Sequence, residues 1–209
     1  MNPPATESPD AVLAALPGAE LVDFVVIGGS AGAIETLGLV ASRLTARFAP
    51  AMAVVVHMAQ DARTMLPEIL SAPGRPRMKV AEDKEPIAPG TIYFAPPGYH
   101  LLVEAEHTFA LSVDEPEHFS RPSIDVLFES AADAYQARVA GVILSGANSD
   151  GAAGLRAIAD AGGATLVQNP DAAVSPAMPE AALLACPGSK VVDAPTLAKW
   201  LASLERRDV

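Results

Sequence analysis

Ser30, His57 and Asp150 are the residues of this chain whose types and positions point most directly to chemistry. Each of them comes at or soon after the end of a short apolar run of the kind that forms a buried parallel strand. A serine hydroxyl can attack an acyl carbon if a neutral imidazole takes its proton and a carboxylate fixes the imidazole tautomer. Because the carboxyl ends of parallel strands share one edge of an open α/β sheet, we expect the three side chains to meet there.

The turn that carries Ser30 has the sequence Gly-Gly-Ser-Ala-Gly (28–32), and a helical pattern follows it. A strand-to-helix turn of this kind would present the hydroxyl, with the first N–H groups of the next helix facing what it attacks. A packing turn and a phosphate-binding turn are the alternatives for this motif. Against phosphate binding, Ser30 replaces the glycine that would approach a pyrophosphate, and the next apolar strand ends in His57 rather than in a ribose-binding carboxylate.

Asp150 lies in a glycine-rich stretch between an apolar strand and a helix. Taken alone it would be an ordinary helix N-cap. If the three residues do meet, the negative charge that develops on the substrate oxygen needs preorganised donors. The backbone N–H of Ala31 and one N–H from residues 145–148, including Ala147 and Asn148, are the candidates.

The wider pattern predicts an α/β fold: a doubly wound, mostly parallel, Rossmann-like sheet with helices on both faces and an inserted antiparallel β-hairpin. Apolar spacing predicts one helix over residues 124–135 and another that buries Trp200. The hairpin is expected from residues 99–103 and 108–113. The parallel strands are expected near residues 24–27, 53–57, 91–95, 140–144, 164–167 and 190–192.

The length of 209 residues and the half-apolar composition predict one domain, over residues 21–205, after a flexible, proline-rich tail at residues 1–20. The net charge of −11 argues against nucleic acid and anionic membranes as partners. No apolar run is long enough to insert in a membrane, and no basic residue precedes Arg43 to begin a secretory signal, so we expect a cytoplasmic protein. Cys186, the single cysteine, is expected to be a buried apolar residue, and we expect neither a metal nor a cofactor.

Six blocks, in order, resemble the bacterial chemotaxis protein-glutamate methylesterases over roughly residues 24–193. They are Val-Ile-Gly-Gly-Ser-Ala-Gly (26–32), Val-Val-His-Met (55–58), Tyr-Phe-Ala-Pro-Pro-Gly-Tyr-His-Leu (93–101), Arg-Pro-Ser-Ile-Asp-Val-Leu-Phe (121–128), Gly-Val-Ile-Leu-Ser-Gly (141–146) with Asp-Gly-Ala (150–152), and Gln-Asn (168–169) with Met-Pro-Glu-Ala (178–181). The resemblance implies hydrolysis of glutamyl methyl esters on the cytoplasmic domain of chemoreceptors, with glutamine deamidation as a second activity. It places nucleophile, base and orienting acid on Ser30, His57 and Asp150.

Three departures from this family bear on the expectation. Residues 1–20 are too few to form the receiver domain that many members carry, which implies constitutive activity or a separate regulatory partner. Residues 145–148 read Ser-Gly-Ala-Asn where the family usually has Thr-Gly-Met-Gly, so the pocket wall differs. Ser120 stands where the family usually has a histidine before the Arg-Pro-Ser block; His118, three residues before Arg121, and Arg121 itself are candidate substrate contacts.

Two other functions stay open on the sequence alone. The chain could be a non-catalytic methylesterase-like module that docks on a signalling partner, since the altered loop at residues 147–148 would fit lost turnover. It could also be a nucleotide- or phosphate-binding Rossmann-like domain that uses the turn at residues 28–32.

Overall fold

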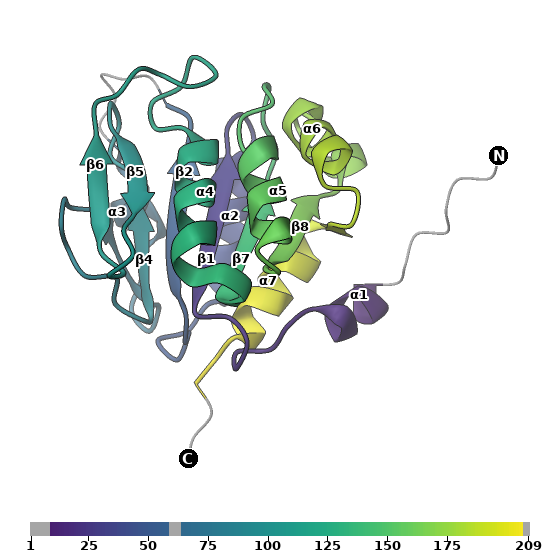
Figure 1. Ribbon diagram of the computed structural model, residues 1–209. Helices are drawn as coiled ribbons and strands as arrows, with labels where there is room; N and C mark the ends of the chain where they lie inside the picture. Colours follow the sequence, from purple (N-terminus) through teal and green to yellow (C-terminus); the bar gives the residue numbers. More distant parts are fainter. Residues whose placement is uncertain (1–8, 59–63, 207–209) are drawn as a thin grey trace.

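A seven-stranded parallel sheet organises the chain (Figure 1), and the computed structural model describes residues 9–58 and 64–206. Residues 1–8 of the expected tail and residues 59–63 of the expected domain lie outside this description. The strand order is β3-β4-β2-β1-β7-β8-β9. The bounds are β1 Phe24–Gly29, β2 Ala51–Val56, β3 Arg77–Val80, β4 Thr91–Phe94, β7 Val139–Ile143, β8 Ala164–Gln168 and β9 Lys190–Val192.

The predicted fold class is confirmed, and so are the predicted parallel strands and the inserted hairpin. The hairpin is a separate antiparallel pair, β5 (His100–Val103) with β6 (Phe109–Ser112). One strand, β3, was not predicted from the sequence. Its residues Arg-Met-Lys-Val contain no apolar run, because β3 lies at the edge of the sheet and is not fully buried.

Helices cover both faces of the sheet, as the buried strand sequences require. α4 (Ile124–Tyr135), α5 (Ala152–Asp160) and α6 (Ala177–Ala185) lie in front in Figure 1, and α2 (Ala33–Arg43) and α7 (Ala194–Ser203) lie behind. Side chains alternate along β1: Val25 and Ile27 pack in the core with α2 and α7, whereas Phe24 and Val26 pack in the core with α4. Trp200 and Cys186 are buried, as predicted.

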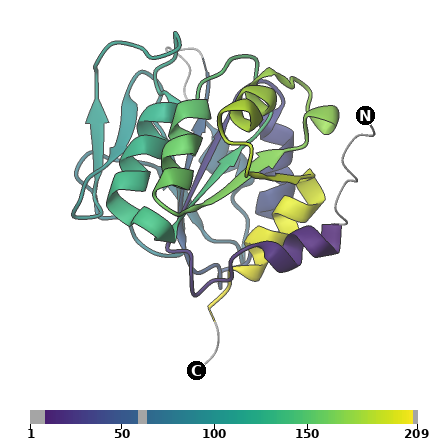
Figure 2. The ribbon, with the colours of Figure 1, turned by 45° about the vertical axis from the view of Figure 1, so that its right-hand side comes forward.

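Shorter elements complete the described chain: α3 (Leu66–Leu70) and the 3-10 helices η1 (Gln136–Arg138) and η2 (Pro170–Ala172). A further helix, α1 (Pro9–Ala15), lies within the segment for which the sequence predicted a tail. Figure 2 shows α1 beside α7. Trp200 Nε1 donates a hydrogen bond of 3.0 Å to the carbonyl of Pro17, and Val12 is buried, so this segment packs on the domain.

β1 pairs with β2 on one side and with β7 on the other. The chain adds its earlier strands on the β2 side of β1 and its later strands on the β7 side, so β1 marks the topological switch point of the sheet. At such a switch point the connections leave on opposite faces of the sheet, and a crevice opens beyond the carboxyl ends of the strands. The sequence predicted that three reactive residues share this edge. The observed order shows that they follow three adjacent strands.

Candidate active site

Ser30 and His57 follow neighbouring strands in register. Gly29, the last residue of β1, pairs with Val56, the last residue of β2. Ser30 therefore follows β1 at the same level at which His57 follows β2. The N–H of His57 donates to the carbonyl of Gly29 at 3.0 Å, and the N–H of Ser30 donates to the carbonyl of Ser145, after β7, at 2.9 Å. Backbone pairing therefore fixes where both residues leave the sheet.

Glycines in this turn permit close packing that a side chain would prevent. A Cβ on Gly28 would lie 2.3 Å from Cγ2 of Ile124, and one on Gly29 would lie 2.5 Å from the Cβ of Ala33. Gly32 has a φ of 85°, in the left-handed region, and α2 begins at the next residue. The absence of a side chain at Gly28 thus lets the first turn of α4 pack against the end of β1.

His57 and Asp150 form a hydrogen-bonded pair, with 2.7 Å between His57 Nε2 and Asp150 Oδ2. Because an ionised carboxylate only accepts hydrogen bonds, the proton of a neutral His57 is assigned to Nε2. The other ring nitrogen, Nδ1, is then unprotonated and is the atom that can take a proton. The expected contact between His57 and Asp150 is therefore present.

Asp150 is fully buried, yet four groups donate hydrogen bonds to its carboxylate. Besides His57, these are the Ser123 hydroxyl at 2.8 Å, the Ile124 N–H at 2.8 Å and the Asp125 N–H at 3.0 Å. Burial is the largest influence and opposes ionisation, but the hydrogen bonds from His57, the two N–H groups and Ser123 together outweigh it and lower the pKa of Asp150. Asp150 is therefore held as an anion against His57.

Ser30 is half-buried, and within the described residues its hydroxyl makes no hydrogen bond to His57. The structure thus joins two of the three predicted residues directly and places the third on the adjacent strand end. A gap of this kind is common before substrate binds, because catalytic hydrogen bonds tighten in the complex.

The hydrogen bonds of the loop after β7 reduce the number of candidate oxyanion donors. The N–H of Ser145 donates to Gln168 Oε1 at 2.9 Å, and the N–H of Gly146 donates to the carbonyl of Ser175 at 3.1 Å. Of the residues 145–148 this leaves the N–H groups of Ala147 and Asn148, since the hydrogen bonds found in the described chain do not use them. The Asn148 side chain accepts from the Asp150 N–H at 3.3 Å.

Ser145, which the sequence did not single out as a functional side chain, connects the two loops that would bind the oxyanion. Its hydroxyl donates to the carbonyl of Ala31 at 2.6 Å and accepts from the N–H of Ser175 at 2.9 Å. Its sequence signals were its position at the end of an apolar strand and its place in the altered stretch of residues 145–148. Ser123 is recognisable in the sequence as the N-cap at the entry of a helix, but its buried hydrogen bond to Asp150 was not predicted.

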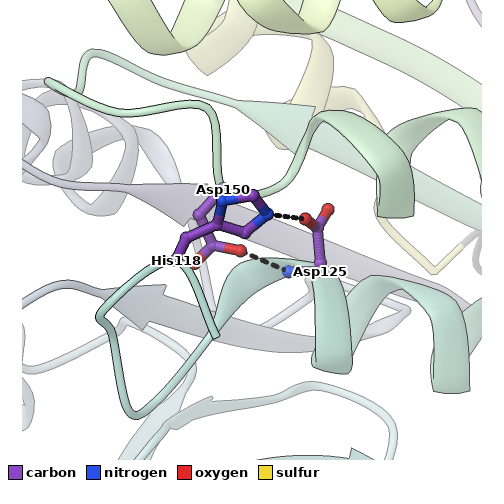
Figure 3. Close-up of side chains that lie close together, drawn as sticks. All are labelled: His118, Asp125 and Asp150. Atoms are coloured by element: carbon purple, nitrogen blue, oxygen red, sulfur yellow. Dashed lines mark hydrogen bonds and ion pairs between the residues drawn. The ribbon is translucent and has the colours of Figure 1, made fainter. Parts of the chain in front are cut away.

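His118 and Arg121, the candidate substrate contacts, both bind within the protein. His118 Nε2 lies 3.3 Å from Asp125 Oδ2 (Figure 3). Nη1 of Arg121 donates to the carbonyls of Val113 and Asp114, at 2.7 and 2.9 Å. Both side chains therefore hold the loop that runs from β6 to α4.

Asp125 is buried and caps a helix: its Oδ1 accepts from the N–H of Gly154 in α5 at 2.7 Å. Burial raises the pKa of Asp125, and the nearby charge of Asp150 adds to this shift. His100 and His107 have structural roles. His100 Nδ1 accepts from the Ser123 N–H at 3.2 Å, and His107 stacks on Tyr135.

One atom each of His118, Asp125 and Asp150 could serve as a metal ligand, and these atoms lie within 4.8 Å of one another. The carboxylate oxygens of Asp150, however, already face four hydrogen-bond donors. Such donors present partial positive charge where a cation would have to bind. These surroundings therefore fit an Asp150 carboxylate that orients a histidine better than one that binds a metal ion.

Fold and site together define an α/β enzyme with its reactive groups at the switch point of a parallel sheet. The family model described as CheB methylesterase matches residues 25–201. The chain therefore belongs to the CheB methylesterase family, a family of carboxylic ester hydrolases. In the described ranges no helix is long and apolar enough to cross a membrane.

Individual relatives agree with this family assignment. A Leptospira interrogans protein, provisionally named protein-glutamate methylesterase/protein-glutamine glutaminase, is 40% identical over 90% of this chain and 97% of its own length. A Methanospirillum hungatei protein of the same name is 34% identical over 89% of this chain, which spans 53% of that relative. The crystal structure of the Thermotoga maritima CheB methylesterase catalytic domain matches with a TM-score of 0.82 at 28% identity, covering 90% of this chain and all of that one.

Proposed function

We propose that this protein is a cytoplasmic serine esterase that removes methyl groups from methylated glutamate side chains of a chemoreceptor and also deamidates receptor glutamines. The observation that carries the proposal is the hydrogen-bonded His57–Asp150 pair. His57 directly follows β2 and Asp150 lies in the loop after β7, and these two strands flank β1, which leads to Ser30. The names of the relatives supply the substrate class. A docking module without catalysis would have no need for a buried anion aligned on a histidine.

In the proposed reaction, Ser30 Oγ attacks the γ-carbonyl carbon of the ester while its proton passes to Nδ1 of His57. The N–H groups of Ala31 and of Ala147 or Asn148 stabilise the oxyanion. When the tetrahedral intermediate collapses, the carbon–oxygen bond to the methoxy group breaks, and His57 returns the proton so that methanol leaves. Water then attacks the acyl-enzyme by the same path and releases the glutamate carboxylate and Ser30. With a glutamine substrate, ammonia is the first leaving group.

Asp150 remains ionised throughout, and its task is to keep the imidazole oriented and to stabilise the imidazolium. Its low pKa suits this task, since an orienting acid that took up a proton would lose both functions.

The test is methanol release from a methylated receptor cytoplasmic fragment. We expect Ser30→Ala to lower the rate at least about a thousandfold, the scale on which loss of a nucleophile acts. Ser42→Ala on α2, whose exposed hydroxyl donates to the carbonyl of Leu39, serves as the matched control and should retain wild-type activity. Equal turnover by wild type and Ser30→Ala would refute the proposed nucleophile.

A further inference from the structure

The loop between β6 and α4 ends in a tight turn over residues 117–120. Glu117 and Ser120 pair through two backbone hydrogen bonds, of 3.1 and 2.7 Å. The two residues between them, His118 and Phe119, have φ values of 48° and 62°. This left-handed region is uncommon for residues other than glycine, and for a bulky residue such as Phe119 it is an outlier, so the turn holds Phe119 in a conformation that this residue does not favour.

Contacts on both sides hold the turn in place. Arg121 donates to the carbonyls of Val113 and Asp114, which ties together the two ends of the loop. His118 pairs with buried Asp125, and Figure 3 shows its ring above the start of α4, close to Asp150. Polar atoms of His118 and Asp150 lie within 4.8 Å of each other. The turn is thereby anchored directly beside the catalytic edge.

Phe119 is the residue that this anchored turn presents to solvent. Its relative exposure is 102%, the largest among the exposed apolar residues of the described chain. An aromatic ring held fully in water contributes nothing to the core, and it supplies a large apolar area to a partner at little entropic cost. The contacts of His118 and Arg121 within the protein hold Phe119 in this exposed position.

We propose that Phe119 is a specificity-determining contact that packs against an apolar side chain of the protein substrate while its ester enters the catalytic edge. The proposal rests on the proposed function. Asp114, Glu115 and Glu117 are exposed on the same loop. The substrate surface that fits therefore has an apolar side chain flanked by neutral or basic residues, since an acidic surface would be repelled.

The first experiment compares Phe119→Ala with wild type on two substrates, a methylated receptor cytoplasmic fragment and the small ester p-nitrophenyl acetate. We expect kcat/KM for the protein substrate to fall about tenfold more than kcat/KM for the small ester, because losing the burial of an aromatic ring has at least that effect. Phe119→Leu should keep most of the preference for the protein substrate. Equal losses on both substrates, or no loss on either, would overturn the proposal.

Two further variants separate the contribution of the ring from backbone strain and from exposed apolar area in general. Phe119→Asn removes the ring but suits the left-handed backbone, so it should be as thermally stable as wild type and yet lose the same preference. Leu21→Ala removes an exposed apolar side chain just before β1, at the amino ends of the strands and so away from the catalytic edge. This variant should change kcat/KM for neither substrate.

A second measurement separates failure of this inference from failure of the proposed function. Ser30→Ala and the double variant Ser30→Ala/Phe119→Ala are titrated with the same receptor fragment, and the dissociation constants are measured by calorimetry. We expect the double variant to bind about tenfold more weakly. Equal affinities would overturn the role of Phe119 even if wild type releases methanol, whereas weaker binding would support it even if wild type releases none.

Discussion

Asp150 and Asp125 cap each other's helices: Asp150 caps α4, which contains Asp125, and Asp125 caps α5, which follows Asp150. Asp150, just before α5, accepts the N–H groups of Ile124 and Asp125 in the first turn of α4, and Asp125 accepts the N–H of Gly154 in the first turn of α5. Each carboxylate also gains from the positive end of the helix dipole it faces. These reciprocal hydrogen bonds hold the starts of α4 and α5 together, and one of the two carboxylates, that of Asp150, also binds His57.

Removing the Asp125 carboxylate should weaken both the fold and the active site. In Asp125→Ala the Gly154 N–H loses its acceptor, and we expect a loss of about 1–3 kcal/mol in the free energy of unfolding, measured by urea denaturation. Because the Asp150 loop is then less firmly held, kcat should fall more than KM rises. Asp125→Asn keeps an oxygen acceptor and should be milder in both measurements. Wild-type stability of Asp125→Ala would contradict the mutual capping.

Stability in acid should depend on Asp150. Its pKa is lower in the folded protein than the ordinary value of 3.8, so the unfolded chain binds more protons as the pH falls through this range. The stabilising contribution of Asp150 is complete above that ordinary value and is lost as the pH falls through its lower folded pKa. We therefore expect Asp150→Asn to be less stable than wild type at neutral pH but to lose less further stability in acid, by urea midpoints at several pH values.

Asp125→Asn provides the control of opposite sign for this pH dependence. Burial raises the pKa of Asp125, so its protonation in acid favours the folded state. Replacing it should make the acid loss of stability at least as steep as in wild type. If Asp125→Asn and Asp150→Asn flattened the profile equally, the assignment of the two shifts would be wrong.

Gly28 should tolerate no side chain. In Gly28→Ala the new Cβ would lie 2.3 Å from Ile124, whose N–H binds Asp150, so α4 must shift and the carboxylate with it. We expect a loss of about 1–3 kcal/mol in stability and lower esterase activity. Gly38→Ala in α2 is the matched control: a Cβ there meets nothing within 4 Å and should stabilise the helix by up to about 1 kcal/mol. Similar urea midpoints for the two variants would argue against this packing.

Ser145 should matter for turnover although it touches no reacting atom. Its hydroxyl holds the carbonyl of Ala31 and the N–H of Ser175, so Ser145→Ala frees the loops that carry the proposed oxyanion donors. We expect kcat for methyl ester hydrolysis to fall about tenfold or more, since one misplaced donor has an effect of that order or larger. Stability should fall by about 1 kcal/mol. Unchanged kcat would exclude Ser145 from positioning these loops.

The sequence by itself determined the fold class and led to the three proposed catalytic residues, because both inferences rest on local patterns. Apolar runs predict buried parallel strands, and parallel strands bring polar residues at their carboxyl ends to one edge. That reasoning reached Ser30, His57 and Asp150 without contact information. It failed for β3, whose edge position leaves no apolar run, and for α1, which packs on the distant α7 and is followed by Pro17, the hydrogen-bond partner of Trp200.

Only the tertiary structure decided which strands are neighbours and what surrounds Asp150. His57 and Asp150 are 93 residues apart in the chain, and no local pattern states that β2 and β7 flank β1. The exchange of caps between Asp125 and Asp150 and the inward contacts of His118 and Arg121 are likewise long-range or loop contacts, set by how α4 and α5 pack. Local sequence patterns thus identify candidate residues. The partners of these residues depend on how the helices and strands pack, and that packing is driven by burial of the whole apolar core.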